Sequence, residues 1–279
     1  MKTKVLYDQG SAIIAEDGII FQPPHFYGAI DGVSGIYLPN EGPKLFDGRT
    51  GGQSASHAIS YAFESAEAGE SLKDILRRAN TMIRELSKTN GLSLQGSELL
   101  PSAAFIVVSI TSKSINIIQG GDSLAVWLMK DGTIGGTPNR MFTYEDELLN
   151  TVAMLMKKNE GDRQKMWEEF RPILTDKRRA NTNTAQGGFA LINGQPEFEN
   201  FLQGSVLKRE EAALLILFSD GFVPFEWTQN EKSLAEKVVH LYQRGGLNSV
   251  LKETRRIAEQ KKSLSHEDYA EATAISIEF

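Results

Sequence analysis

Residues 26–35 run Phe-Tyr-Gly-Ala-Ile-Asp-Gly-Val-Ser-Gly, an apolar segment that ends in an acid and a glycine. Apolar and aromatic residues bounded by turn formers predict a strand from Phe26 to Ile30. A second apolar segment, Leu214 to Phe218, ends in the same way, with Ser-Asp-Gly at residues 219–221. An acid that directly follows a buried strand lies at the mouth of a packed sheet, so both acids are candidates for chemistry.

Acidic residues recur at the edges of other predicted strands. The full set consists of Glu16-Asp17, Asp31, Asp122 within Gly-Gly-Asp-Ser, Asp220, and Glu267-Asp268 with Glu271. Carboxylates at strand ends are rigidly aimed, and several that converge from different strands hold hard divalent cations such as Mg²⁺ or Mn²⁺ through oxygen. The set therefore indicates two-metal phosphoryl chemistry.

An ordinary turn is the alternative for each Asp-Gly pair, because glycine supplies a positive φ and aspartate caps its own turn. Five such pairs occur, so most are expected to be turns, and Asp47-Gly48 and Asp131-Gly132 are interpreted in that way. Asp31 and Asp220 differ from them because each directly follows an apolar β-like run.

The pattern along the rest of the chain predicts an α+β protein. Strands are expected at Ser11–Ala15, Ile19–Phe21, Phe26–Ile30, Ala103–Ile110, Ser114–Ile118, Ser123–Met129, Ala212–Phe218 and Thr273–Phe279. Helices are expected from about Gln53, from Ser71 with Asp74 as a capping box, and at Glu145–Leu174, Ser233–Gln243 and Leu247–Gln260. Residues 177–203 are polar and poorly patterned, which indicates a surface excursion. Helices that come in pairs favour sheets flanked by helix pairs over a doubly wound parallel sheet, and we expect one domain over residues 1–279.

Composition excludes several classes of function. The net charge of −6 and the pI near 5.4 argue against a nucleic-acid binder, which needs clustered Lys and Arg. The absence of cysteine excludes thiolate zinc sites and cysteine nucleophiles. No apolar run is long enough to cross a bilayer and no secretion signal is evident, so we expect a cytoplasmic protein without a membrane partner. The four histidines lack ligand spacing, and there is no P-loop or nucleophile elbow.

Five sequence features, in this order, carry a family resemblance. They are Glu16-Asp17, Asp31-Gly32-x-x-Gly35 after a strand, Gly120-Gly121-Asp122-Ser123, Leu217-Phe218-Ser219-Asp220-Gly221, and the closing Ala272-Thr273-Ala274-Ile275. Together they resemble the metal-dependent serine/threonine phosphatases of type 2C, the PPM family, over nearly the whole chain. The resemblance implies a four-layer αββα sandwich in which two antiparallel sheets are each covered by a helix pair. It also implies a variable flap-like excursion around residues 141–203.

The resemblance also implies residue roles. Asp31 would bridge two Mg²⁺ or Mn²⁺ ions, the Gly32 carbonyl would bind one of them, and Asp220 would bind the other. Glu16 and Asp17 would add partly water-mediated contacts, and Asp122 would hold a third, weaker ion. Asp31 and Asp220 are thus the expected catalytic residues, and a water activated between the two cations would attack the phosphoester of a phosphorylated protein.

Three positions depart from the family pattern. Val33 stands where many members have a histidine that protonates the leaving group. Ala12 stands in place of a phosphate-binding arginine, for which Lys44 or Arg49 is a candidate substitute.

Ala270 stands in place of the last metal-binding acid. Asp268 or Glu271 is then the substitute. We favour Asp268, because a small bulge before the strand would bring it near, whereas Glu271 would face solvent as an alternating strand residue.

Two rival functions stay open. A pseudophosphatase would keep the fold as a regulatory binding domain without turnover, which Ala12, Val33 and Ala270 favour. A hydrolase of small phosphorylated metabolites would use the same metal site. We expect a monomer that acts on phosphoproteins.

Overall fold

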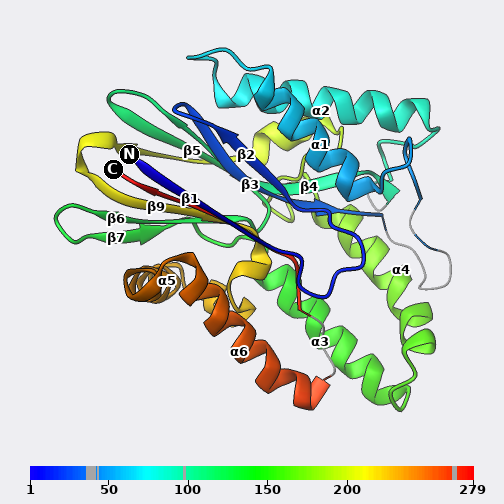
Figure 1. Cartoon of the computed structure of the whole chain (residues 1–279). Helices are drawn as coiled ribbons and strands as arrows, with labels where there is room; N and C mark the ends of the chain where they lie inside the picture. Colours follow the sequence, from blue (N-terminus) through cyan, green and yellow to red (C-terminus); the bar gives the residue numbers. More distant parts are fainter. Residues whose placement is uncertain (36–41, 43, 97–98, 266–268) are drawn as a thin grey trace.

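Two antiparallel five-stranded sheets lie face to face in the computed structural model, which describes the chain except residues 36–41, 43, 97–98 and 266–268 (Figure 1). We call them the β1 sheet, with strand order β1-β10-β9-β6-β7, and the β3 sheet, with order β2-β3-β4-β5-β8. The strands are β1 (Lys2–Asp8), β2 (Gly18–Gln22), β3 (Phe26–Val33), β4 (Ser102–Ile110), β5 (Ser114–Gly120), β6 (Leu124–Met129), β7 (Ile134–Gly136), β8 (Gln203–Lys208), β9 (Ala212–Phe218) and β10 (Ala272–Glu278).

Helix pairs cover the outer faces of both sheets (Figure 1). The helices are α1 (Gly51–Glu64), α2 (Leu72–Thr89), α3 (Phe142–Lys158), α4 (Arg163–Asn181), α5 (Glu231–Gly245) and α6 (Leu247–Ser265). Short 3-10 helices follow the chain at η2 (Pro196–Phe201), η3 (Arg209–Glu211), η4 (Asp220–Phe222) and η5 (Phe225–Gln229). Helices α1 and α2 pack on the β3 sheet through one apolar core, and α5 and α6 pack on the β1 sheet through another. A third core, which includes Ile106, Leu215 and Ile275, fills the space between the sheets, so the expected αββα sandwich is confirmed.

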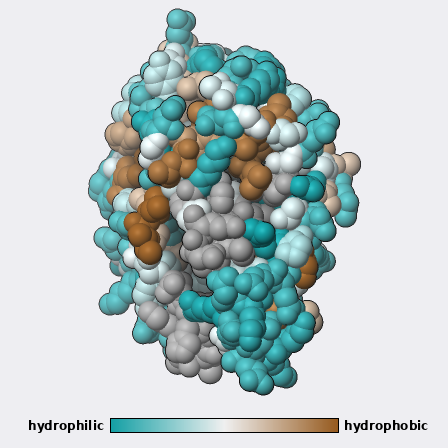
Figure 2. All heavy atoms as spheres, turned by 90° about the vertical axis from the view of Figure 1, so that its right-hand side faces the viewer, coloured by the Kyte–Doolittle hydropathy of each residue, from teal (hydrophilic) through white to brown (hydrophobic). Residues whose placement is uncertain are grey.

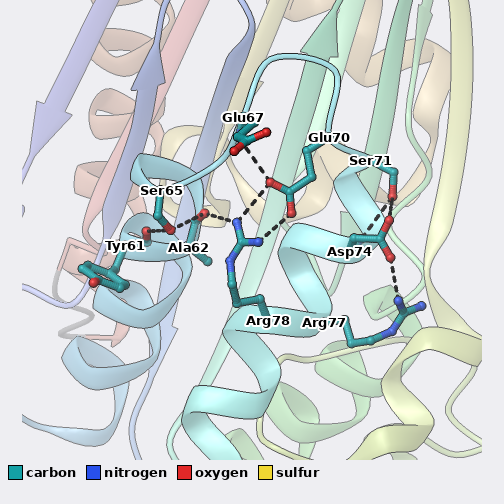
Figure 3. Close-up of polar contacts among 9 residues, drawn as sticks. All are labelled: Tyr61, Ala62, Ser65, Glu67, Glu70, Ser71, Asp74, Arg77 and Arg78. Carbon is teal, nitrogen blue, oxygen red and sulfur yellow. Dashed lines mark hydrogen bonds and ion pairs between the residues drawn. The ribbon is translucent and has the colours of Figure 1, made fainter.

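The α1–α2 pair is fixed by its caps and by one arginine. Thr50 and Gln53 form a reciprocal capping box at the start of α1, whereas at α2 the Ser71 side chain accepts the backbone N–H of Asp74. Arg78 of α2 donates to Glu70 Oε1 at 2.6 Å and to the Ala62 carbonyl of α1 at 2.7 Å (Figure 3). These contacts tie the last turn of α1 to the loop that precedes α2.

The amino-terminal part of the chain differs from the sequence expectation. Residues Lys2–Asp8 form β1, an edge strand that pairs with β10, although no strand was expected there. The strand expected at Ser11–Ala15 is absent, because the chain turns at Gly10, whose φ is +60°, and then crosses to β2. The predicted strand is wrong because the turn at Gly10 outweighs the β propensity of the short segment that follows it.

Residues 142–181 form a helical hairpin, α3 and α4, that packs largely on itself. Its small core contains Leu155, Met166 and Phe170. The surface excursion expected at residues 177–203 is wrong in two respects. Helix α4 continues to Asn181, and residues 189–193 form a buried segment against β4. Figure 2 shows the side of the molecule that lies to the right in Figure 1, where hydrophobic side chains form a band across the upper middle and hydrophilic ones gather above it and at the lower right.

In the part of the chain that the structure describes, no helix is both long and apolar enough to cross a membrane.

Candidate metal centre

Three carboxylates from three different strand ends meet at one edge of the sandwich. Asp31 is near the end of β3, Asp122 lies in the crossover from β5 to β6, and Asp220 follows β9. Each offers an oxygen, and these oxygens all lie within 4.8 Å of one another. The three acids therefore form one cluster that both sheets contribute to.

The strand register explains why Asp122 and Asp220 are neighbours. Leu124 of β6 pairs with Phe218 of β9 in an antiparallel ladder. Asp122 precedes that pair by two residues and Asp220 follows it by two, so the two acids extend from the same end of adjacent strands. Gly121, with a φ of +79°, makes the tight turn from one sheet to the other that places Asp122 there.

Burial, and after it the charges of neighbouring acids, raises the pKa values of the cluster. Asp31 is half-buried and Asp122 is buried, whereas Asp220 keeps part of its surface in contact with solvent. The pKa of Asp31 is raised well above its ordinary value, first by burial and then by the charges of Asp220 and Asp17. Burial, followed by the charge of Asp122, raises the pKa of Asp220 to about 7. A bound cation would reverse this cost, because it stabilises the ionised form.

Asp17 joins the cluster through a serine. Its Oδ2 accepts a hydrogen bond from Ser219 Oγ at 2.8 Å, and Ser219 Oγ in turn accepts the backbone N–H of Thr273 at 2.9 Å. Burial raises the pKa of Asp17 to about 7, with a smaller contribution from the charges of Glu271 and Asp220. Ser219 thus links β9, β10 and the loop that carries Asp17.

Glu16 points toward the start of α1. Its Oε1 accepts hydrogen bonds from Ser34 Oγ, at 2.5 Å, and from Thr50 Oγ1. Thr50 is also the N-cap of α1, so the carboxylate lies where the helix dipole favours a negative charge. Two hydroxyl partners already satisfy Oε1, which leaves Oε2 as its oxygen for a further ligand.

Gly32 lies in a backbone crossing that excludes a side chain. A Cβ at this position would collide with the Glu16 carbonyl and with Gly52 at 2.8 Å. The close approach of these three backbone segments holds the end of β3 in place, and with it Asp31 and the Gly32 carbonyl.

Asp268 and Glu271 are the two candidates for the last metal ligand, and the structure describes only Glu271. Asp268 lies outside the described residues. Glu271 is half-buried and accepts hydrogen bonds from the Tyr7 hydroxyl at 2.6 Å and from the Glu16 backbone N–H at 2.8 Å. The expectation that Glu271 faces solvent is therefore wrong, because its carboxylate positions the Glu16-Asp17 segment. At Ala270, the backbone carbonyl accepts a hydrogen bond from Arg255 Nη2 at 2.7 Å.

The two candidate substitutes for a phosphate-binding arginine were Lys44 and Arg49. The Lys44 amine donates to the Asn90 carbonyl at 3.2 Å and lies 5.3 Å from the centre of the Phe46 ring. Arg49 pairs through its backbone with Phe46. Neither contact connects these residues to the acid cluster.

Glu145 is a site residue that the sequence did not single out. It lies in the first turn of α3, where its carboxyl group shares a hydrogen bond with that of Asp122, and burial raises the pKa of both. Asn139 Nδ2 donates to Glu145 Oε2 at 3.2 Å and to Thr228 Oγ1 at 3.1 Å, which holds the acid in place. In the sequence, Glu145 is one of several charges on a mixed helix, and an acid in a first turn is usual for any helix.

The residues present fit a divalent cation of the Mg²⁺ or Mn²⁺ type. Asp122 is only 7% exposed, and its Oδ1 is buried with no hydrogen-bond partner among the described residues. A buried carboxylate oxygen without a partner is costly unless a cation or a proton compensates it. The ligand atoms that these acids offer are all oxygens, which Mg²⁺ and Mn²⁺ prefer.

Comparison with solved structures finds the same fold in bacterial phosphatases. The serine/threonine phosphatase Stp1 from Staphylococcus aureus matches with a TM-score of 0.56 at 15% identity, over 100% of this chain and 94% of that chain. The Mycobacterium tuberculosis serine/threonine phosphatase PstP matches with a TM-score of 0.57 at 15% identity, over 100% of this chain and 98% of that chain. The catalytic domain of PstP in complex with two manganese ions matches with a TM-score of 0.57 at 12% identity, over 99% of this chain and 96% of that chain.

At the level of sequence, no family model and no curated protein matches the chain. The likeness is therefore one of architecture, which is shared over the full length of the chain. The chain has the fold of the type 2C serine/threonine phosphatases, the PPM family.

Proposed function

We propose that this protein is a Mg²⁺- or Mn²⁺-dependent serine/threonine phosphatase that hydrolyses phosphoesters of phosphorylated proteins. One observation carries the proposal: Asp31, Asp122 and Asp220 converge within 4.8 Å at the edge of a fold shared with protein phosphatases. Like charges gathered in this way are unfavourable in themselves, so a cationic ligand is the simplest reason for them.

Each acid has a proposed role. Asp31 and Asp220 would hold two cations, and the Gly32 carbonyl would be a further ligand to one of them. Asp17, oriented by Ser219, and Glu16, oriented by Ser34 and Thr50, complete the surroundings. Asp122 would hold a third and weaker ion, and Asp268 remains the proposed replacement for the acid absent at Ala270.

Divalent cations bound there would supply Lewis-acid activation of the attacking water and would offset the charge of the phosphoester. The protein's own contribution is rigid placement, because Asp31 and Asp220 are attached to paired strands rather than to free loops. Val33 carries no proton donor, so the leaving alkoxide must take its proton from water or from another acid.

A pseudophosphatase is the second candidate, and specific positions favour it. Ala270 has no ligand atom in its side chain, and its carbonyl is engaged by Arg255. A domain with one weakened cation site would bind a partner rather than turn over substrate. The convergence of Asp31, Asp122 and Asp220, with the charge of Asp17 close to them, supports the enzyme, because a purely structural domain gains nothing from their repulsion.

We further propose that residues 1–279 act as one domain, with 141–203 as the flap-like part that influences substrate choice. We propose that the protein works as a cytoplasmic monomer.

Hydrolysis of p-nitrophenyl phosphate and of a phosphothreonine peptide, each with Mn²⁺ and with EDTA, tests the proposal. Turnover of both substrates that requires the metal is the expected result. Turnover of only the small ester would indicate a metabolite hydrolase, and no turnover of either, in protein shown to bind Mn²⁺, would establish the binding-domain alternative.

A further inference from the structure

A pocket of about 190 Å³ opens directly beside the acid cluster. Asp122, Glu145 and Asp220 form one side of it. The apolar part of the lining, which we call the apolar wall, comes from the segment after β9 and from α6; its residues are Val223, Pro224, Phe225, Ile257 and Ala258. The pocket is therefore continuous with the place where a phosphoester would be held.

Several polar groups that line this pocket, other than the carboxylates of the acid cluster, are already paired within the protein. Thr228 Oγ1 accepts from Asn139 and donates to the Phe225 carbonyl at 2.8 Å, and Thr254 Oγ1 donates to the Phe222 carbonyl at 2.8 Å. Arg255 donates from Nε to Asp8 at 3.0 Å and from Nη2 to Ala270. Apart from the carboxylates, the pocket therefore offers few free hydrogen-bonding groups to a side chain that enters it. The remaining contact surface is mainly the apolar wall.

The apolar wall is held in place by contacts with neighbouring parts of the fold. The Phe225 ring stacks on Phe142 of α3, with ring centres 4.8 Å apart and planes 9° from parallel. Val223 is buried, and α6 is attached to the same segment through Thr254. A wall held in this way keeps its shape before a ligand arrives, which lowers the entropic cost of binding.

The volume limits what the pocket can take. A dry cavity of about 150 Å³ accommodates a benzene molecule, whereas sites for complete small ligands are usually about 300 Å³ or more. The space therefore suits one medium-sized apolar side chain. An acidic side chain would be repelled by Glu145 and Asp220 unless cations fully offset their charge.

We propose that this pocket receives an apolar side chain of the phosphoprotein substrate, from a residue that flanks the phosphorylated serine or threonine. This inference rests on the proposed phosphatase function and adds sequence selectivity to it. The side chain enters between Phe225 and Ala258 while the phosphate lies at the acid cluster. Leucine, isoleucine and methionine have the size and polarity that the pocket fits.

Peptide binding tests the pocket independently of turnover. The probes are peptides with a non-hydrolysable phosphonate in place of phosphothreonine, in which leucine, alanine or aspartate occupies each flanking position in turn. Their affinities for the Mn²⁺-loaded protein are measured by fluorescence anisotropy. At one flanking position, leucine is expected to bind about tenfold tighter than aspartate, with alanine between them.

Two variants assign that preference to the pocket. Ala258→Leu fills it and should bring the ratio of leucine to aspartate affinities close to one, while Lys252→Leu, on an exposed position of the same helix that does not line the pocket, should leave the ratio unchanged. Ile257→Ala widens the pocket and should shift the preference from leucine toward phenylalanine, which covers the case in which Ala258→Leu fails to fold.

The outcomes separate the pocket from the catalytic proposal. A leucine preference that Ala258→Leu removes supports the pocket, even if the matching phosphopeptides are not hydrolysed and the phosphatase proposal fails. No preference at any flanking position, or a preference that survives both Ala258→Leu and Ile257→Ala, overturns the pocket, even if phosphopeptides are hydrolysed.

Discussion

Ser219 Oγ lies 2.8 Å from Asp17 Oδ2, so the residue just before Asp220 orients an acid that stands 202 positions earlier in the chain. The same hydroxyl accepts the Thr273 backbone N–H, which anchors it to β10. Two acids of the cluster are therefore set by one short segment at the end of β9.

Substitution Ser219→Ala removes the hydrogen bond that orients Asp17. Residues that hold a metal ligand in position typically contribute 10–100-fold to affinity, so we expect Mn²⁺ binding to weaken about tenfold. Calorimetric titration of the purified protein measures this. Ser112→Ala, at an exposed turn far from the cluster, is the matched control and should bind Mn²⁺ as the wild type does. Equal affinity in the two variants would show that Ser219 has no orienting role.

Substitution Glu145→Gln separates stability from metal binding. Replacing the half-buried Glu145 carboxylate beside the buried Asp122 relieves repulsion, so the metal-free protein should melt at a higher temperature. The same change removes a negative charge beside Asp122, so the extra stability that Mn²⁺ confers should become smaller.

Glu147→Gln is the control for Glu145→Gln, since Glu147 is exposed on the same helix and pairs with Lys177 at the surface. It should change neither quantity by much. A lower melting temperature for metal-free Glu145→Gln than for the wild type would contradict the account.

The pH dependence of stability has a definite sign in the metal-free protein. Folding raises the pKa of Asp17 and of Asp220 from 3.8 to about 7, so between these values the folded state binds more protons than the unfolded state. Proton binding by these two carboxyl groups therefore stabilises the folded state. This contribution is fully present below pH 3.8, the pKa in the unfolded state, and is lost as pH rises through about 7. The melting temperature in EDTA should therefore fall from about pH 5 to about pH 8 through this contribution.

Manganese should reverse that trend, because it binds the ionised carboxylates and competes with protons. The Mn²⁺-induced rise in melting temperature should thus be larger at high pH. Asp220→Asn should flatten the slope in EDTA, whereas the turn variant Asp47→Asn should keep it. A slope of the opposite sign in the wild-type protein, or one that Asp220→Asn leaves intact, would refute the assignment.

Substitution Gly221→Ala tests how the site is assembled. A Cβ at Gly221 would overlap the Glu271 carbonyl and approach Ala270 Cβ at 2.9 Å, so the segments before β10 and after β9 would have to separate. Forced backbone shifts of this kind typically cost about 1–3 kcal/mol, and we expect the free energy of unfolding to fall by that amount together with Mn²⁺ affinity.

Gly204 of β8 provides the control, because a Cβ there meets only the Ile117 carbonyl at an ordinary 3.7 Å. Gly204→Ala should retain both stability and metal affinity. Chemical denaturation measures the first and calorimetry the second. Unchanged stability in Gly221→Ala would mean that the close approach of Gly221 to Ala270 and Glu271 is not required for the folded structure.

Much of the fold could be predicted because its buried strands are continuous apolar runs. Segments such as Ala103–Ile110 and Ala212–Phe218 lie between two packed layers, so both of their faces are hydrophobic and they stand out in the sequence. β1 lies at a sheet edge and is partly exposed on both faces, so Lys2–Asp8 shows no such run. The α3–α4 hairpin packs mainly on itself, which leaves its charges mixed and its boundary at Asn181 unmarked.

The candidate site was predictable only where an acid stands at or near the end of a strand. Asp31, Asp122 and Asp220 follow this rule, and the structure brings them together. Glu145 and Glu271 owe their positions to contacts between segments that are distant in sequence, and no local pattern distinguishes them from surface acids. The hydroxyl of Ser219 likewise gains its importance from Asp17, which lies in the segment between β1 and β2.

The most direct measurement is a calorimetric titration of Mn²⁺ into wild-type protein and Asp31→Asn, with Asp47→Asn as the control in an exposed Asp-Gly turn. Asparagine has nearly the same shape as aspartate but lacks the charge, and melting curves establish that the variants are folded. The account predicts that wild type and Asp47→Asn bind Mn²⁺ alike and that Asp31→Asn loses at least 100-fold in affinity, on the order of 3 kcal/mol. Equal binding by folded Asp31→Asn and wild type would contradict the claim that this cluster holds the metal.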